Sequence, residues 1–160
     1  MIEAALIFNY HGKPRLSKFY ESDYTPEEQK AVIKAVYQAV SNRPDSYCNF
    51  VSTDGIPLKG DGLKLVYRHY ATLYVVMIVD QTESSLAILD LIQTFVEGLN
   101  KVMENVCELD MVLNTDRVVM VLDELIMGGM VSETTLASLA EVMTIQKRML
   151  GPAKPPSGKK

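Results

Sequence analysis

Side chains that ligate transition metals or act as nucleophiles are scarce in this sequence of 160 residues. It has no tryptophan, two histidines and two cysteines. His11 and His69 have no cysteine or carboxylate at the spacing of a zinc site, and no nucleophile-elbow motif is present for a histidine-based triad. A metal centre and a serine or cysteine hydrolase are therefore not expected.

Phosphate-binding fingerprints are also missing. Gly12-Lys13 lacks the preceding glycine of a phosphate-binding loop, and Pro14 stands where Ser or Thr would hold magnesium. Gly60-Asp61-Gly62 precedes an expected strand, whereas a dinucleotide fingerprint opens a helix. We therefore expect no catalytic residues, no cofactor and no enzymatic activity; a small enzyme on this scaffold would need a convergent polar site.

The charge and hydropathy of the chain exclude further classes. The net charge of −4 gives little support to nucleic-acid binding. No apolar run approaches the length of a membrane span, and the apolar start is too short for a signal peptide. We expect a cytoplasmic protein in which Cys48 and Cys107 are reduced and buried.

Apolar residues make up 48% of the chain and charged residues 22%, which is typical of a folded domain. Alternating and β-branched runs, separated by turn residues, predict two hairpins and one further strand. The expected strands cover residues 2–8, 15–20, 47–51, 63–70 and 73–79. Tight connections such as Ala71-Thr72 favour an antiparallel sheet.

Helical periodicity accounts for most of the remainder. Thr25-Pro26-Glu27-Glu28 is typical of a capped helix start, and this helix should end near Val40. Three more helices are expected: one from about Ser84 to Met103, one over 110–127 stopped by Gly128-Gly129, and one capped by Ser132 and ended by Gly151-Pro152. We expect one domain over residues 1–150 and a disordered basic tail over 151–160, rich in Pro, Gly and Lys.

The helices offer more apolar surface than one small sheet needs. Residues 118–122 are five consecutive apolar residues, and the chain contains nine methionines, a residue that adapts to binding surfaces. These observations together favour an interaction module with a protein partner, although for any single methionine a core position is favoured by about two to one.

Three segments resemble the small (sigma) chains of clathrin-type adaptor complexes. Residues 12–20, GKPRLSKFY, resemble the first hairpin of that family; residues 64–74, KLVYRHYATLY, resemble its central hairpin; and residues 105–110, NVCELD, resemble its most recognisable hexapeptide. The resemblance extends from Met1 to about Met149. The RHYAT and MGGMV segments and the long loop after Val51 are most similar to the type found in adaptor protein complex 3.

The resemblance implies an α/β (α+β) fold, a longin-like five-stranded antiparallel sheet flanked by helices in the order β-β-α-β-β-β-α-α-α. It implies a heterotetramer with a delta-type large chain, a beta-type large chain and a medium chain. It also implies vesicle transport from Golgi and endosomes toward lysosomes or vacuoles, with the complex peripheral on these membranes and recruited through an Arf-type GTPase.

The resemblance further implies a role in binding acidic dileucine signals in the cytosolic tails of cargo. Carried over by alignment, Arg15 lies near the acidic residue of the signal and Asn105 lies at the edge of an apolar pocket. The implied pocket residues are Ala71, Leu73, Val96, Val106, Leu109 and Met111. Leu73 and Val96 would also be apolar in any core, and Arg15 is compatible with a solvated strand residue.

A second hypothesis is another longin-like trafficking chain, either a coatomer small chain or a subunit of a tethering complex. The 105–110 motif and the basic segment 13–18 favour the adaptor.

Overall fold

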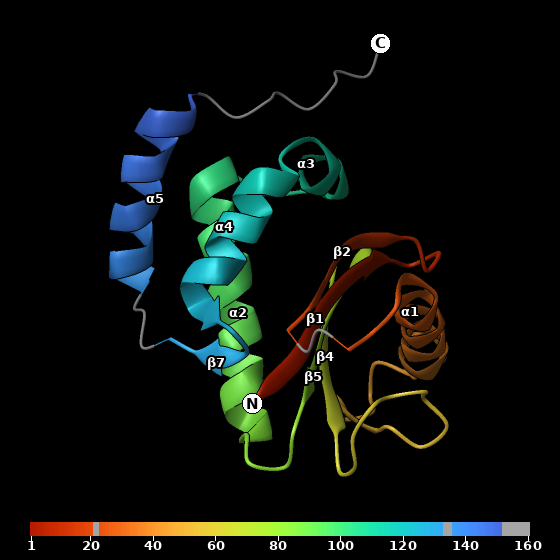
Figure 1. The fold of residues 1–160 in the computed structure, drawn as a ribbon. Helices are drawn as coiled ribbons and strands as arrows, with labels where there is room; N and C mark the ends of the chain where they lie inside the picture. Colours follow the sequence, from red (N-terminus) through yellow and green to blue (C-terminus); the bar gives the residue numbers. More distant parts are fainter. Residues whose placement is uncertain (21–22, 133–135, 152–160) are drawn as a thin grey trace. The chain divides into compact units, whose positions relative to one another are not determined.

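The computed structural model describes residues 1–20, 23–132 and 136–151 (Figure 1). The chain forms two units, Met1–Asp90 and Leu91–Lys160, with the boundary inside the helix α2 (Ser85–Met103). The first unit contains β1 (Ile2–Asn9), β2 (Pro14–Phe19), α1 (Pro26–Ser41), β3 (Phe50–Ser52), β4 (Lys64–Tyr70) and β5 (Leu73–Val79). The second contains α3 (Glu108–Leu113), α4 (Thr115–Leu125), β6 (Ile126–Met127), β7 (Met130–Val131) and α5 (Leu136–Leu150).

The five strands of the first unit form one sheet in the order β2-β1-β5-β4-β3, and every neighbouring pair is antiparallel. This confirms the predicted five-stranded antiparallel sheet. The expected strands differ from the observed ones by a residue or so at their ends, except that the third covers Phe50–Ser52 instead of 47–51.

Strand β1 is hydrogen-bonded on both sides, to β2 and to β5 (Figure 1). Seven of its eight residues are buried, with only Glu3 half-buried. A strand that is buried on both faces has a nearly continuous run of apolar residues in its sequence. The sequence has such a run from Ala4 to Phe8.

Helix α1 covers one face of this sheet. Thr25 and Glu28 form a capping box, in which Glu28 N–H donates to Thr25 Oγ1 at 3.3 Å and Thr25 N–H donates to Glu28 Oε2 at 2.7 Å. The buried stripe of α1, Val32, Ile33, Val36 and Val40, shares a core cluster with alternate residues of the strands. Those strand residues include Ala4, Leu6, Phe8, Leu65, Tyr67, Val76 and Ile78.

The long loop before β4 is tied to the start of α1. Lys59 Nζ lies 2.7 Å from Glu28 Oε2 and 5.2 Å from the centre of the Tyr24 ring, and it donates to the carbonyl of Asp23. Lys59 N–H donates to the Tyr24 hydroxyl at 2.7 Å. Hydrogen bonds from Lys59 and from the backbone of Thr25 lower the pKa of Glu28.

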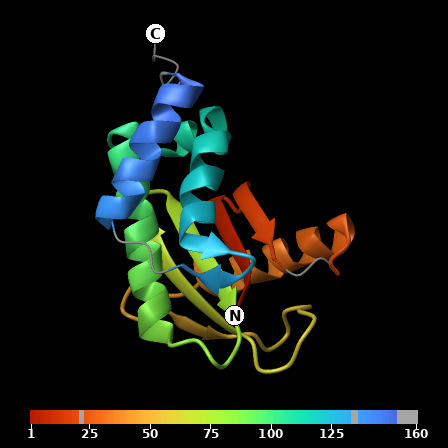
Figure 2. The same ribbon diagram turned by 60° about the vertical axis from the view of Figure 1, so that its left-hand side comes forward.

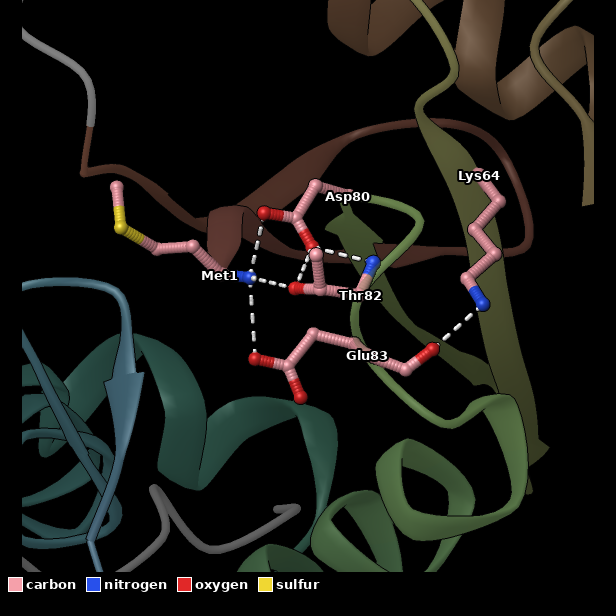
Figure 3. A network of polar contacts seen from close by, with 5 residues as sticks. All are labelled: Met1, Lys64, Asp80, Thr82 and Glu83. Carbon is pink, nitrogen blue, oxygen red and sulfur yellow. Dashed lines mark hydrogen bonds and ion pairs between the residues drawn. The ribbon is translucent and has the colours of Figure 1, made fainter.

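A polar network joins the amine of Met1 to the end of β5 (Figure 3). The amine lies 2.7 Å from Asp80 Oδ2 and 3.1 Å from Glu83 Oε1, and Lys64 Nζ donates to the Glu83 carbonyl at 2.6 Å. Hydrogen bonds from the amine and from Thr82 lower the pKa of Asp80 to about 2. Burial opposes the charge of the amine, but its hydrogen bonds to Asp80 and Glu83 outweigh burial and raise its pKa.

The second unit departs from the prediction at the expected helix over 110–127. The structure has two helices instead, α3 and α4, because Asn114 between them adopts a non-helical conformation with φ −122° and ψ 39°. Its side chain is buried, its N–H donates to the Asp110 carbonyl at 2.8 Å, and its own carbonyl accepts from Val118 at 3.1 Å. One residue thus ends one helix and begins the next.

The expected helix stop at Gly128-Gly129 is also wrong, since α4 ends at Leu125. Both glycines have positive φ, 56° and 83°, and they connect the two-residue strands β6 and β7, with Met127 opposite Met130. Positive φ at both central residues is what a two-residue hairpin turn of the I′ type requires. Figure 2 shows this small hairpin directly after α4.

Close packing holds the helices of the second unit together. A Cβ at Gly98 of α2 would lie 2.5 Å from Leu139 of α5 and 3.1 Å from Val121 of α4, so glycine permits this approach. Arg117, which is buried in α4, donates to the carbonyl of Gly151 just after α5. Helix α5 ends at Leu150 as predicted, whereas the expected cap at Ser132 adjoins residues 133–135, and the tail from 152 on lies outside the described residues.

The Asp80 network predicts a pH-dependent stabilisation. Since the pKa of Asp80 is depressed in the folded state, its contribution is present above its ordinary value of 3.8 and is lost as the pH falls toward about 2. We expect Asp80→Asn to lower the Tm at neutral pH, and the difference from wild type to shrink as the pH falls from about 4 toward 2. Thermal unfolding followed by circular dichroism across this range checks it; an equal difference at every pH would contradict the assignment.

Candidate functional site

The eight residues of the implied dileucine site fall into two groups along the chain. Arg15, Ala71 and Leu73 belong to the first unit. The other five belong to the second unit and lie on α2, on the loop after it and on α3: Val96, Asn105, Val106, Leu109 and Met111.

The first group gathers at one end of the sheet. Tyr10 N–H, just after β1, donates to the carbonyl of Thr72 at 2.9 Å, and Asn9 lies opposite Leu73 in the β1–β5 ladder. The turn between β4 and β5, which contains Ala71, therefore lies beside the turn that leads into β2, where Arg15 is the second residue.

Ala71 and Leu73 differ in exposure. Ala71 is exposed and has φ 49°, a left-handed conformation that is uncommon for residues other than glycine. Leu73 is 7% exposed, and Arg15 is half-buried on the edge strand β2.

The alternation of side chains along β5 gives the face of the sheet on which Leu73 lies. Val76 of β5 belongs to the core cluster beneath α1, and Tyr74 packs against that cluster. Since successive side chains of a strand point to opposite faces, Leu73 lies on the face of the sheet away from α1.

The second group is built around the loop that follows α2. Glu104 and Asn105 have positive φ values of 54° and 61°, and they reverse the chain between α2 and α3. Val106 N–H donates to Asn100 Oδ1 at 3.0 Å, which fixes the exit of this loop. Asparagine tolerates this conformation better than most residues, so Asn105 suits the position on conformational grounds as well.

Helix α3 starts with a reciprocal cap between Cys107 and Asp110. Cys107 N–H donates to Asp110 Oδ2 at 2.9 Å, the Cys107 thiol lies 3.1 Å from the same oxygen, and Asp110 N–H donates to the Cys107 carbonyl at 3.1 Å. Asp110 is itself buried. The cap orients the turn that carries Leu109, which is half-buried, and Met111, which is 3% exposed.

The prediction that both cysteines are buried is wrong: Cys48 and Cys107 are exposed and free. Cys48 lies in the loop between α1 and β3, and the cap position of Cys107 holds its side chain outside the first turn of α3. Cellular compartment governs the oxidation state of a thiol, whereas local backbone position governs its exposure.

Metal-ligating side chains do not converge. Across residues 1–20, 23–132 and 136–151, no group of three or more His, Cys, Asp or Glu side chains is placed to hold a metal ion. In the same part of the chain no helix has the length and hydropathy needed to cross a membrane.

Residues 1–149 match the family described as clathrin adaptor complex small chain. The chain belongs to this family. It is 48% identical over 149 residues to the human AP-3 complex subunit sigma-2, covering 93% of this chain and 76% of the relative.

Distant organisms give similar relatives. The AP-3 complex subunits sigma of Dictyostelium discoideum and Arabidopsis thaliana are 46% and 49% identical over 150 and 144 residues, covering 93% and 89% of this chain and 87% and 82% of the relatives. A chain of the structure described as "Homology model of the full-length AP-3 complex in a stretched open conformation" has a TM-score of 0.72 and 37% identity, over 93% of this chain and 95% of that chain. These findings confirm the predicted family and fold.

Sequence reasoning overlooked Asp110 as a positioning residue. The spacing of Cys107 and Asp110, three residues apart ahead of an apolar run, is that of a capping box. Cysteine is not among the preferred N-cap residues, and this disguised the signal.

We expect Asp110→Ala to weaken the start of α3. Losing the cap should reduce the free energy of unfolding by about 1 kcal/mol and should speed amide exchange at Cys107 more than at residues of α1. Hydrogen exchange with mass spectrometry measures both regions at once. Unchanged protection at Cys107 would show that the Asp110 carboxylate does not hold this turn.

Proposed function

We propose that this protein is the small subunit of a heterotetrameric vesicle adaptor complex of the AP-3 type, acting in intracellular protein transport. The observation that carries the proposal is the 46–49% identity to AP-3 sigma subunits of animals, an amoeba and a plant across most of the chain. The hypothesis of a coatomer or tethering subunit is the less favoured alternative, since these relatives are named as AP-3 sigma subunits.

Its partners in the proposed complex are a delta-type large chain, a beta-type large chain and a medium chain. The complex would act peripherally on Golgi, endosomal and vesicle membranes after recruitment by an Arf-type GTPase, with delivery toward lysosomes or vacuoles. Residues 1–150 would form the adaptor domain, which agrees with the family match over 1–149, and residues 151–160 a basic tail.

Within this complex, the proposed task of the chain is to help bind acidic dileucine signals. The leucines of the signal would insert among Ala71, Leu73, Val96, Val106, Leu109 and Met111, beside Asn105. The burial of two leucine side chains offers roughly 1.5–3 kcal/mol each, and the ordering of a flexible tail offsets part of this gain. The result is weak and reversible capture, which suits sorting.

Arg15 would meet the acidic residue of the signal. A guanidinium and a carboxylate form charge-assisted hydrogen bonds, and a half-buried arginine on an edge strand is screened less by salt than a fully exposed one.

Affinity purification of the tagged chain from native cytosol tests the complex. We expect two large adaptin chains and one medium chain to co-purify with it in equal amounts. One of the two large chains should be of the delta type. Recovery of the chain alone, or with coatomer or tethering proteins, would overturn the proposal.

Site variants test cargo recognition in the purified complex. We expect Arg15→Glu and Val96→Asp each to weaken the binding of an acidic dileucine peptide by about tenfold or more. Arg15→Glu replaces an attraction worth about 1.5–3 kcal/mol with a repulsion. Val96→Asp puts a carboxylate against apolar side chains. Fluorescence polarisation with a labelled peptide gives the Kd.

Two matched substitutions control for charge and helix effects. Arg148→Glu makes the same charge change at an exposed residue of α5, and Leu86→Asp puts the same carboxylate on an exposed position of α2. Both should bind the peptide as wild type does. Equal affinity of all four variants, with the complex intact, would reject the residue assignment.

A further inference from the structure

A groove of about 390 Å³ lies between the β1–β2 turn and α1, on the face of the sheet that α1 covers. This volume is within the range of small-ligand pockets, about 300–1,000 Å³. Its lining includes Gly12 and Pro14 from the turn and Lys30, Ile33, Lys34 and Tyr37 from α1.

The turn that forms one wall is held by its own hydrogen bonds. The side chain of Asn9, which is buried, accepts from His11 N–H at 3.0 Å and from Lys13 N–H at 2.9 Å. Gly12 has φ 83°, and a Cβ there would lie 2.8 Å from the Tyr37 ring. The Tyr37 hydroxyl donates to the Tyr10 carbonyl at 2.7 Å, so both walls of the groove are tied together without a ligand.

The interior of the groove is apolar. Ile33 is 8% exposed at its base, and Pro14 and the Tyr37 ring add carbon surface. The Tyr37 hydroxyl already donates to Tyr10. The interior of the groove therefore offers burial to one apolar side chain.

The rim of the groove is basic. Lys30 and Lys34 are exposed one helical turn apart on α1, and Lys13 is exposed on the turn. Among the described residues these three lysines form no ion pair, whereas Lys59 at the start of the same helix is paired with Glu28. Unpaired lysines around an apolar groove are complementary to an apolar residue flanked by carboxylates.

We propose that this groove binds an acidic segment of a partner protein, with one large apolar side chain of that segment inserted beside Ile33 and Tyr37. The groove accepts an apolar side chain beside Ile33 and Tyr37 while the exposed lysines of its rim meet carboxylates, so a peptide segment that carries both is the occupant. Leu73 lies on the opposite face of the sheet, and the groove is separate from the proposed dileucine site.

A labelled peptide with one central phenylalanine and two glutamates on each side is a suitable probe. It lacks a pair of leucines, so it does not satisfy the dileucine signal. We expect it to bind the purified full-length chain, alone and in the assembly that co-purifies with it, more weakly as salt is raised. Versions with the phenylalanine replaced by serine, or with the glutamates replaced by glutamines, should bind at least about tenfold more weakly.

Lys30→Glu/Lys34→Glu should reduce probe affinity by about tenfold, because two weak attractions become two repulsions. Lys101→Glu/Arg148→Glu makes the same charge change at exposed residues of α2 and α5 and should leave the affinity unchanged. Both lysines are exposed on α1. An unchanged Tm of the Lys30→Glu/Lys34→Glu variant would show that its folding is intact.

Three outcomes would overturn the proposal. One is that the phenylalanine probe does not bind, and that versions of it with leucine or tyrosine at the central position do not bind either. Another is equal loss of binding in the two double variants, which would assign the effect to net charge. The third is binding of phosphoinositide-containing vesicles that depends on Lys30 and Lys34, without binding of any of the peptides, which would assign the basic rim to a membrane.

Discussion

The pairing of β1 with β5 is the constraint on which the first unit depends. It joins residues 2–9 to residues 73–79, so it closes a loop that contains α1 and three of the strands. Closing so long a loop has an entropic cost, which the burial of β1 on both faces offsets. Substitution of a central residue such as Leu6 with a polar one would therefore affect both sheet neighbours and the α1 core together.

The same pairing positions the first unit's share of the two proposed binding surfaces. Because Asn9 lies opposite Leu73, the β1–β2 turn and the β4–β5 turn lie side by side at one end of the sheet. Alternation of side chains then directs Leu73 to one face, while the groove of Ile33 and Tyr37 lies on the other. The proposed contact of Leu73 with cargo and the proposed capture of an acidic segment would thus use opposite faces of one sheet.

Local chemistry explains which elements were predictable. The β-branched run of β5 and the Thr25–Glu28 capping box carry their own signals, and both were found at the expected residues. The sequence did not predict the break at Asn114 or the β6–β7 hairpin. A stripe of apolar residues at helical spacing continues past Asn114, and paired glycines are equally compatible with a helix stop. The site residues came from family resemblance, since apolar side chains such as Leu73 carry no signal that separates a pocket from a core.

The most direct test of the central claim is an electron cryomicroscopy map of the assembled complex with an acidic dileucine peptide bound. The account predicts that this chain occupies the small-subunit position and that the peptide's leucines contact Leu73 and Val106, with its acidic residue near Arg15. A complex that assembles without this chain, or a peptide that binds away from these residues, would contradict the account.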